Sequence, residues 1–77
     1  PIVVSIKQNG DLYIQERAID ALNLLPRLRA ISQGNKNLRI YVRGDKNVAY
    51  GIVLDTIAKI KRSGFKKVAL VAKLKES

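Results

Sequence analysis

One stretch of the sequence, from Leu38 to Ala72, predicts a complete strand, helix and strand unit. Residues 38–43 alternate between apolar and polar side chains, the pattern of a strand with one buried face. A Gly-Asp turn follows, then a segment with apolar residues at helical spacing, which ends at Gly64. A second alternating run completes the unit. Two strands joined by a helix in this way lie parallel with a right-handed crossover. The buried stripe of the helix is expected to be Val53, Thr56, Ile57 and Ile60, with Ile52 beside it.

The sequence before this unit predicts a hairpin. Alternation over residues 2–6 indicates a first strand, and Asn9-Gly10 follows it. Asn-Gly is a strong hairpin signal because both residues tolerate positive φ. The return strand is expected over 12–15, and residues 16–19 can add a short extended piece.

A first helix is expected between the hairpin and residue 38. Leu22, Leu25 and Leu28 have helical spacing, but Pro26 lies inside the pattern. Proline lacks an N–H donor and is tolerated in the first turn of a helix. The helix should therefore begin near residues 21–23 and end before Gly34. Two side chains are candidates for its N-cap, Asp20 and Asn23.

These elements follow the order ββαβαβ, which predicts one α+β domain over residues 1–77. We expect a two-layer sandwich, with a mixed sheet of about four strands and two helices on one face. A chain of 77 residues buries only a modest core. Packing against a partner would add to its stability.

The composition argues against an enzyme. The chain has no Cys and no His, so thiolate chemistry, imidazole catalysis and the commonest metal ligands are missing. Its six acidic residues are scattered, and neither a nucleophile elbow nor a phosphate-binding loop occurs. We expect no catalytic residues, no metal and no cofactor. The net charge of +9 favours polyanions or acidic segments as partners, or a basic surface that is simply solvated.

The face of the sheet away from the helices is the candidate binding surface. If Leu38, Ile40 and Val42 point to the helices, the residues between them point away. A strand edge beside this face could accept an extended peptide or a second copy of the chain. The expected contact residues are Tyr41, Arg43, Val71 and Lys73. A Tyr- and Arg-bearing sheet also suggests a small basic module for single-stranded RNA, although the aromatic signature of the common RNA-recognition fold is missing.

The residues at the joints of the second half resemble the ExbD/TolR family. They are Arg43-Gly44-Asp45-Lys46-Asn47-Val48-Ala49-Tyr50-Gly51, then Ser63-Gly64-Phe65 after the helix, and Lys67-Val68-Ala69-Leu70-Val71. The similarity covers most of the chain and is sharpest over residues 38–73. Gly44 stands where Ala is usual in the family, and Ala49 where an acidic residue or Pro is common. The motif favours the ExbD branch.

The chemistry of the motif residues suggests a local structural role for each. Asp45 or Asn47 is expected to cap the second helix, and Val48 to act as an apolar staple. Tyr50 is expected to pack its ring while its hydroxyl finds a polar partner, and Gly64 to supply the helix terminus. Because these positions define the fold, the resemblance argues for the fold more strongly than for an activity.

The resemblance implies a function through partners. Such proteins are anchored in the inner membrane of Gram-negative bacteria by one N-terminal transmembrane helix, beside a proton-channel partner of the ExbB/TolQ kind. They couple proton-motive force to TonB or TolA, and their periplasmic domains form homodimers. The TolR branch also engages peptidoglycan. We expect the anchor upstream of Pro1, because no stretch of this chain approaches the roughly 20 apolar residues that span a bilayer. Nucleic acid is not an expected partner.

Overall fold

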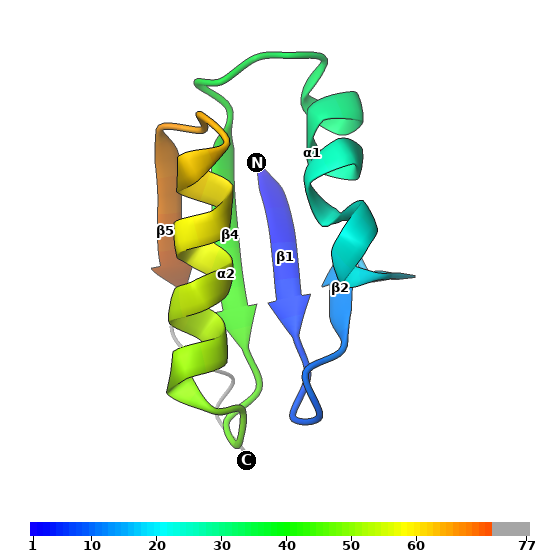
Figure 1. Cartoon of the computed structure of the whole chain (residues 1–77), viewed down its shortest axis with the longest axis vertical. Coiled ribbons are helices and arrows are strands. Elements are labelled where there is room, and N and C mark those ends of the chain that lie inside the picture. The colour runs from blue at the N-terminus through cyan, green and yellow to red at the C-terminus, as the bar shows by residue number, and fades with distance from the viewer. Residues whose placement is uncertain (72–77) are drawn as a thin grey trace.

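A computed structural model describes residues 1–71 as a five-stranded sheet with its helices packed on one face (Figure 1). In chain order the elements are β1 (Ile2–Ile6), β2 (Leu12–Ile14), β3 (Arg17–Ile19), the short 3-10 helix η1 (Ala21–Asn23), α1 (Leu24–Ser32), β4 (Arg39–Gly44), α2 (Tyr50–Arg62) and β5 (Lys67–Val71). The α+β sandwich is thus confirmed. The continuation of the last strand to Ala72 and Leu74 lies outside the described residues.

The sheet is mixed and has the order β3-β2-β1-β4-β5. β1, β4 and β5 run parallel, with Ile2 opposite Ile40 and Ile40 opposite Val68. β2 and β3 are antiparallel additions on the other side of β1. The prediction of about four strands was one short, because Arg17–Ile19 pairs fully with β2. The sheet therefore ends in β3 on one side and in β5 on the other.

The core lies between the sheet and the helices. Alternate residues of β1 and β4 are buried on the helix side, as the sequence pattern predicted. α1 contributes Leu24 and Leu28, and α2 contributes Val53 and Ile60. The predicted stripe of α2 is confirmed at its centre, with Ile57 partly buried, whereas Ile52 is 40% exposed.

The β1–β2 turn and the β2–β3 turn differ in the residues that adopt a positive φ. In the β1–β2 turn, Gly10 has a φ of 94° and its N–H donates to the Lys7 carbonyl. Asn9 keeps a negative φ and instead uses its side-chain oxygen to accept the Asp11 N–H. In the β2–β3 turn, Gln15 and Glu16 adopt φ values of 49° and 72°. Residues other than Gly, Asn and Asp rarely adopt this left-handed backbone conformation.

The first helix begins late, as Pro26 required. Pro26 is the third residue of α1, where the missing N–H interrupts no bond within the helix. Neither Asp20 nor Asn23 makes a side-chain capping bond, so that prediction was wrong. The chain enters α1 through η1, whose backbone turn takes the place of a side-chain cap. At the other end, Gln33 and Gly34 are both left-handed.

The joint between β4 and α2 is held by apolar packing. Ala49 is the N-cap residue and no side chain caps the helix, so neither Asp45 nor Asn47 has the predicted role. The Asp45 carbonyl instead accepts the Val48 N–H in the turn before the helix. Val48 is 5% exposed and stands directly before the cap, and Val53 is the fourth helical residue, which are the positions of a hydrophobic staple.

Gly44 makes room for that staple. A Cβ at this position would lie 2.8 Å from one Val48 methyl and 3.2 Å from a Val53 methyl. At the far end of α2, Gly64 has a φ of 110° and its N–H donates to the Lys61 carbonyl. The two glycines fix where α2 starts and stops, and hence how it lies over β4 and β5.

Candidate partner-binding surface

The outermost strand, β5, has an unpaired long edge. It pairs with β4 on one side, and no strand within residues 1–71 pairs with the other. Its side chains are little covered on either face: Leu70 is 40% exposed on the helix side and Val71 is 37% exposed on the opposite side. An edge strand of this kind presents main-chain donors and acceptors to another chain.

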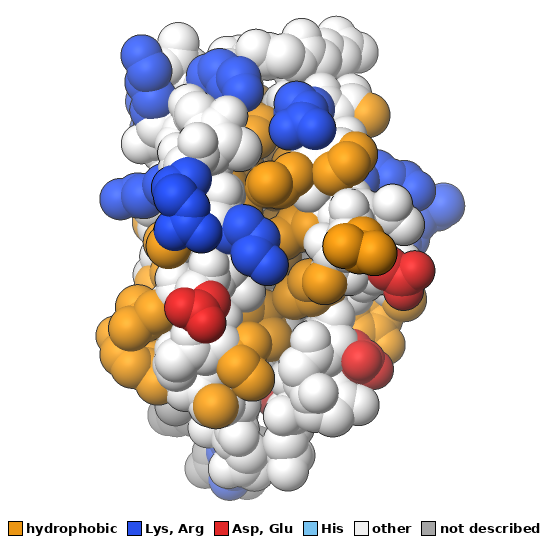
Figure 2. Space-filling view, viewed as in Figure 1, with side chains coloured by type: hydrophobic (Ala, Val, Ile, Leu, Met, Phe, Trp, Pro, Cys, Tyr) orange, Lys and Arg blue, Asp and Glu red, His pale blue; other side chains and the backbone are white. Residues whose placement is uncertain are grey.

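Apolar side chains of α2 continue this edge. Leu54 is 47% exposed and Tyr50 is 60% exposed, and they lie four residues apart on one helix face. The prediction that the Tyr50 ring is packed was therefore wrong for the single chain. Figure 2 shows apolar side chains gathered along the side of the molecule formed by α2 and β5. We call Tyr50, Leu54, Leu70 and Val71, together with the free edge of β5, the β5 surface.

The predicted contact residues lie beside this surface. Tyr41, Arg43 and Val71 all point to the face away from the helices, since they alternate with the buried Ile40 and Val42. Val71 lies directly opposite Arg43 in the β4–β5 register. The structure thus brings three of the four together, while Lys73 lies outside the described residues.

Arg43 is less available than the sequence suggested. Its Nη2 donates to the Ser5 hydroxyl at 3.3 Å, and its buried Nε has no hydrogen-bond partner. It borders a hollow of about 240 Å³ that is also lined by Val3, Gln15 and Glu16. Tyr41 is half-buried next to Val3. Tyr41 and Arg43 are both partly covered, and Val71 is the exposed one of the three.

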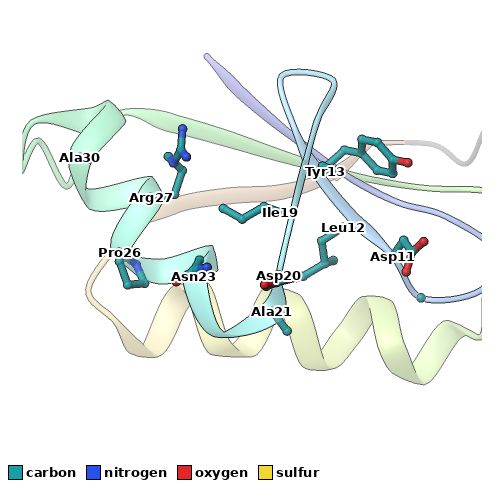
Figure 3. A pocket seen from close by; sticks show the side chains of 12 residues that line it. Asp11, Leu12, Tyr13, Ile19, Asp20, Ala21, Asn23, Pro26, Arg27 and Ala30 are labelled. Carbon is teal, nitrogen blue, oxygen red and sulfur yellow. The ribbon is translucent and has the colours of Figure 1, made fainter.

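A larger hollow lies on the β2–β3 side of the described chain. It is an open groove of about 770 Å³ between the β2–β3 side of the sheet and the η1–α1 segment. Asp11 and Tyr13 lie toward one end and Pro26, Arg27 and Ala30 toward the other (Figure 3). Its two carboxylates, Asp11 and Asp20, belong to a turn and to a helix entrance. Within residues 1–71, no three His, Cys, Asp or Glu side chains gather as a metal site.

Sequence reasoning missed Leu54, Leu70 and Tyr50 as parts of one surface. A signal for Leu54 was present, because a leucine outside the predicted buried stripe of α2 has no partner within the chain. Leu70 gave no such signal. It has the alternation of a buried residue, and its exposure follows only from the position of β5 at the sheet border.

The family described as "Biopolymer transport protein ExbD/TolR" matches residues 1–75. The chain belongs to the ExbD/TolR family. The description of the family names biopolymer transport, and the match includes residues 43–51.

Relatives within the family carry the ExbD name. The biopolymer transport protein ExbD of Pseudomonas putida is 32% identical over 72 residues, which cover 92% of this chain and 51% of the relative. ExbD of Pseudomonas aeruginosa is 31% identical over 71 residues, covering 92% and 53%. ExbD of Escherichia coli K12 is 25% identical over 71 residues, covering 92% and 50%. The chain thus spans about half the length of these ExbD proteins. No helix within residues 1–71 has the length and apolarity to cross a bilayer.

Proposed function

We propose that this chain is the periplasmic domain of an inner-membrane protein of Gram-negative bacteria. The protein couples proton-motive force to a TonB- or TolA-type partner, for outer-membrane transport or envelope integrity. In this proposal a transmembrane helix precedes Pro1 and lies beside an ExbB/TolQ-like channel protein. The domain itself forms a homodimer and binds a partner segment, and peptidoglycan is a further ligand. It acts by binding, not by catalysis.

The observation that carries the proposal is the β5 surface. An added strand would satisfy the free main-chain groups of β5, which gives affinity independent of sequence. Side chains of that strand would alternate between the two faces of the sheet. On one face they would meet Leu54 and Leu70, and on the other Val71, so the apolar contacts would set register and specificity.

The three parallel strands would transmit force from an added strand at β5 to the start of the chain. β5, β4 and β1 run parallel, and five residue pairs join each neighbouring pair of strands. A pull along β5 loads the hydrogen bonds of these ladders side by side. In this shear geometry the hydrogen bonds of a ladder bear the force together. When a strand is peeled from one end, its hydrogen bonds break one at a time under a lower force. A tether attached at Pro1 would therefore feel tension applied at β5 without first unzipping the sheet.

Titration of the isotope-labelled chain with the periplasmic segment of its cognate TonB- or TolA-type protein tests the proposal. Amide shifts should concentrate in β5 and β4. Val71→Asp should raise the Kd for the segment by about tenfold or more, since a charged residue with poor strand propensity then occupies the contact. Ala18→Asp is the matched control, because it makes the same charge change on β3, at the opposite border of the sheet.

The control should change the Kd by less than about twofold. Shifts that avoid the strands and cluster only on the helices would contradict strand addition. An equal loss of affinity in both variants would also contradict it, because only charge or stability would then be at work.

The alternative function, binding of single-stranded RNA on the open sheet face, has less support from the geometry. Tyr13 and Tyr41 are half-buried, and the Lys7 ammonium stands 5.3 Å from the centre of the Tyr13 ring. Arg43 is already bonded to Ser5. Base stacking needs an aromatic ring with a free face, and these rings are partly covered.

A further inference from the structure

Most Lys and Arg side chains of residues 1–71 lie at one end of the domain. This is the end where β1, β4 and β5 begin, and Pro1 lies there too because Ile2 is paired with Ile40 (Figure 1). Four segments contribute: the end of α1, the loop to β4 with the first residue of that strand, the last turn of α2, and the loop to β5 with the first residue of that strand. We call their cations the basic pole: Arg29, Lys36, Arg39, Lys59, Lys61, Arg62, Lys66 and Lys67.

Acidic side chains are absent from the segments that form the basic pole. Residues 21–44 and 56–71 contain no Asp or Glu. Asp11, Asp20 and Asp45 lie at the opposite end of the sheet, and Asp55 lies midway along α2. Glu16, in the β2–β3 turn, is the one acidic residue of the described chain at the Pro1 end, and it lies at the β3 border, outside the four segments of the pole. Figure 2 shows the resulting asymmetry, with blue side chains over the upper half of that face and red ones below. The domain therefore has a charge polarity along its length.

Interactions between two loops hold the pole together. The Lys36 ammonium donates to the Ser63 carbonyl at 2.8 Å and stands 5.0 Å from the centre of the buried Phe65 ring. The Lys66 N–H donates to the Lys36 carbonyl at 3.1 Å. The loop before β4 and the loop before β5 thus form one unit. Apart from Lys36, the cations of the pole are exposed to solvent.

Local helix electrostatics accounts for only part of this charge. The C-terminus of a helix carries about half a negative charge, and α1 and α2 both end here. Eight cations far exceed what two such termini can offset. The remaining positive charge makes this surface attract an external anion, and the attraction weakens as the salt concentration rises.

The shape of the pole favours a planar anionic partner. The groove and the hollow described above are lined by residues outside it. Phe65 is 2% exposed, so it offers no ring for stacking on a nucleic-acid base or a sugar. Within the described residues, Tyr13 and Tyr41 belong to the far sheet face and Tyr50 to the other end of α2. Lysines and arginines without a pocket or an aromatic platform suit a layer of phosphate headgroups.

We propose that the basic pole rests on the surface of a membrane that contains anionic phospholipids. The inference rests on the proposed function, in which a membrane anchor precedes Pro1. A segment joined to Pro1 leaves the domain at this pole, so the pole would face the bilayer and the β5 surface would stand along the side of the domain, free for its partner. Contact with the membrane would orient β5 before the partner arrives.

Vesicle binding by the 77-residue chain tests this proposal. The vesicles are phosphatidylcholine with about one third phosphatidylglycerol, and pure phosphatidylcholine is the reference. The pole variant carries Lys59→Gln, Lys61→Gln, Arg62→Gln and Lys66→Gln. The control carries Lys7→Gln, Arg17→Gln, Arg27→Gln and Lys46→Gln. Both lose four charges, so each has a net charge of +5 (9 minus 4).

We expect the wild-type chain to bind the anionic vesicles and to be released by salt. The pole variant should lose more than about tenfold in partition coefficient, and the control less than about threefold, because cations at the lipid surface contribute most. Equal losses in both variants, or no binding by the wild type, would overturn the proposal. Tighter binding to single-stranded DNA or to peptidoglycan than to the vesicles would also overturn it.

The outcome is independent of strand addition. The pole variant keeps every residue of the β5 surface and should bind the partner segment with unchanged Kd. If the wild type binds vesicles but not the segment, the proposed function fails while the lipid contact stands. The opposite result would leave the partner role intact and remove the lipid contact.

Discussion

The two borders of the sheet are built in opposite ways. β3 has three residues and is led into by the strained turn at Gln15 and Glu16. It contains Arg17, and the chain turns directly from it into η1. β5 has five residues, follows a relaxed glycine turn, and is flanked on both faces by exposed apolar side chains. Short length and charge are the usual protections of a strand edge. β3 has both, and β5 has neither along its apolar half.

This difference shows which border is left available for a partner. A protein that avoided every contact would protect β5 as it protects β3. A cluster of exposed apolar side chains, here Leu54, Leu70 and Val71, is typical of a surface that another chain covers. The β2–β3 side thus has a short border strand with a charged residue, whereas the α2–β5 side carries the surface that we propose binds the partner.

The largest expected effect concerns the joint that positions α2 beside β5. Gly44→Leu should destabilise the fold by about 2–3 kcal/mol, because its side chain must enter the space filled by Val48 and Val53. Gly51→Leu introduces the same residue on α2, at a position where a Cβ meets nothing within 4 Å. It should leave stability unchanged or raise it slightly, since Leu is the better helix former. Urea unfolding measures both.

Equal stability of the two variants would show that the staple is loosely packed. α2 could then shift over β5, and the β5 surface would not be a fixed feature of the fold. A loss at Gly44 alone confirms that the apolar side of α2 is held rigidly against the edge strand.

The next effect concerns self-association through β5. If the proposed homodimer uses the β5 surface when no partner segment is bound, Leu54→Lys should weaken it by about tenfold, because the lysine places a charge in the apolar contact. Leu22→Lys is the matched control: Leu22 is 90% exposed on η1, far from β5. Sedimentation velocity over a range of concentrations measures the dimer constant. If both leucines matter equally, or if neither does, the β5 surface is not the dimer contact.

Much of the fold was predictable from local patterns. Alternation in β1 and β4 fixed which side chains are buried, and Pro26 and Gly64 placed the helix limits correctly. These signals are local, since proline geometry, glycine φ and side-chain alternation are read within a few residues. Within the motif residues, the expected apolar staple at Val48 agrees with its burial.

The parts that were mispredicted depend on competition between distant groups. Asp45 and Asn47 looked like helix caps, but the helix starts later, at Tyr50, where the staple rather than a carboxylate fixes the chain. The strand at Arg17–Ile19 was not counted, because a segment of two exposed residues and one partly buried isoleucine becomes a strand only through pairing with β2. The exposure of Tyr50 and Leu70 depends on the lateral position of β5, which no local pattern encodes.

The smallest expected effect tests the protected border. Glu16→Gly should stabilise the chain by about 0.5–1 kcal/mol, because glycine adopts the left-handed φ of 72° without steric strain. Gln15→Gly relieves similar strain at 49° but loses the bond from the Val3 N–H to the Gln15 side-chain oxygen, so its net change should be near zero or unfavourable. Thermal and urea unfolding of the two variants give the comparison. If both glycines stabilise equally, the Gln15 side chain contributes nothing to holding β1. If Glu16→Gly destabilises, the turn is not strained, and the β3 border would owe its protection to shortness and charge alone.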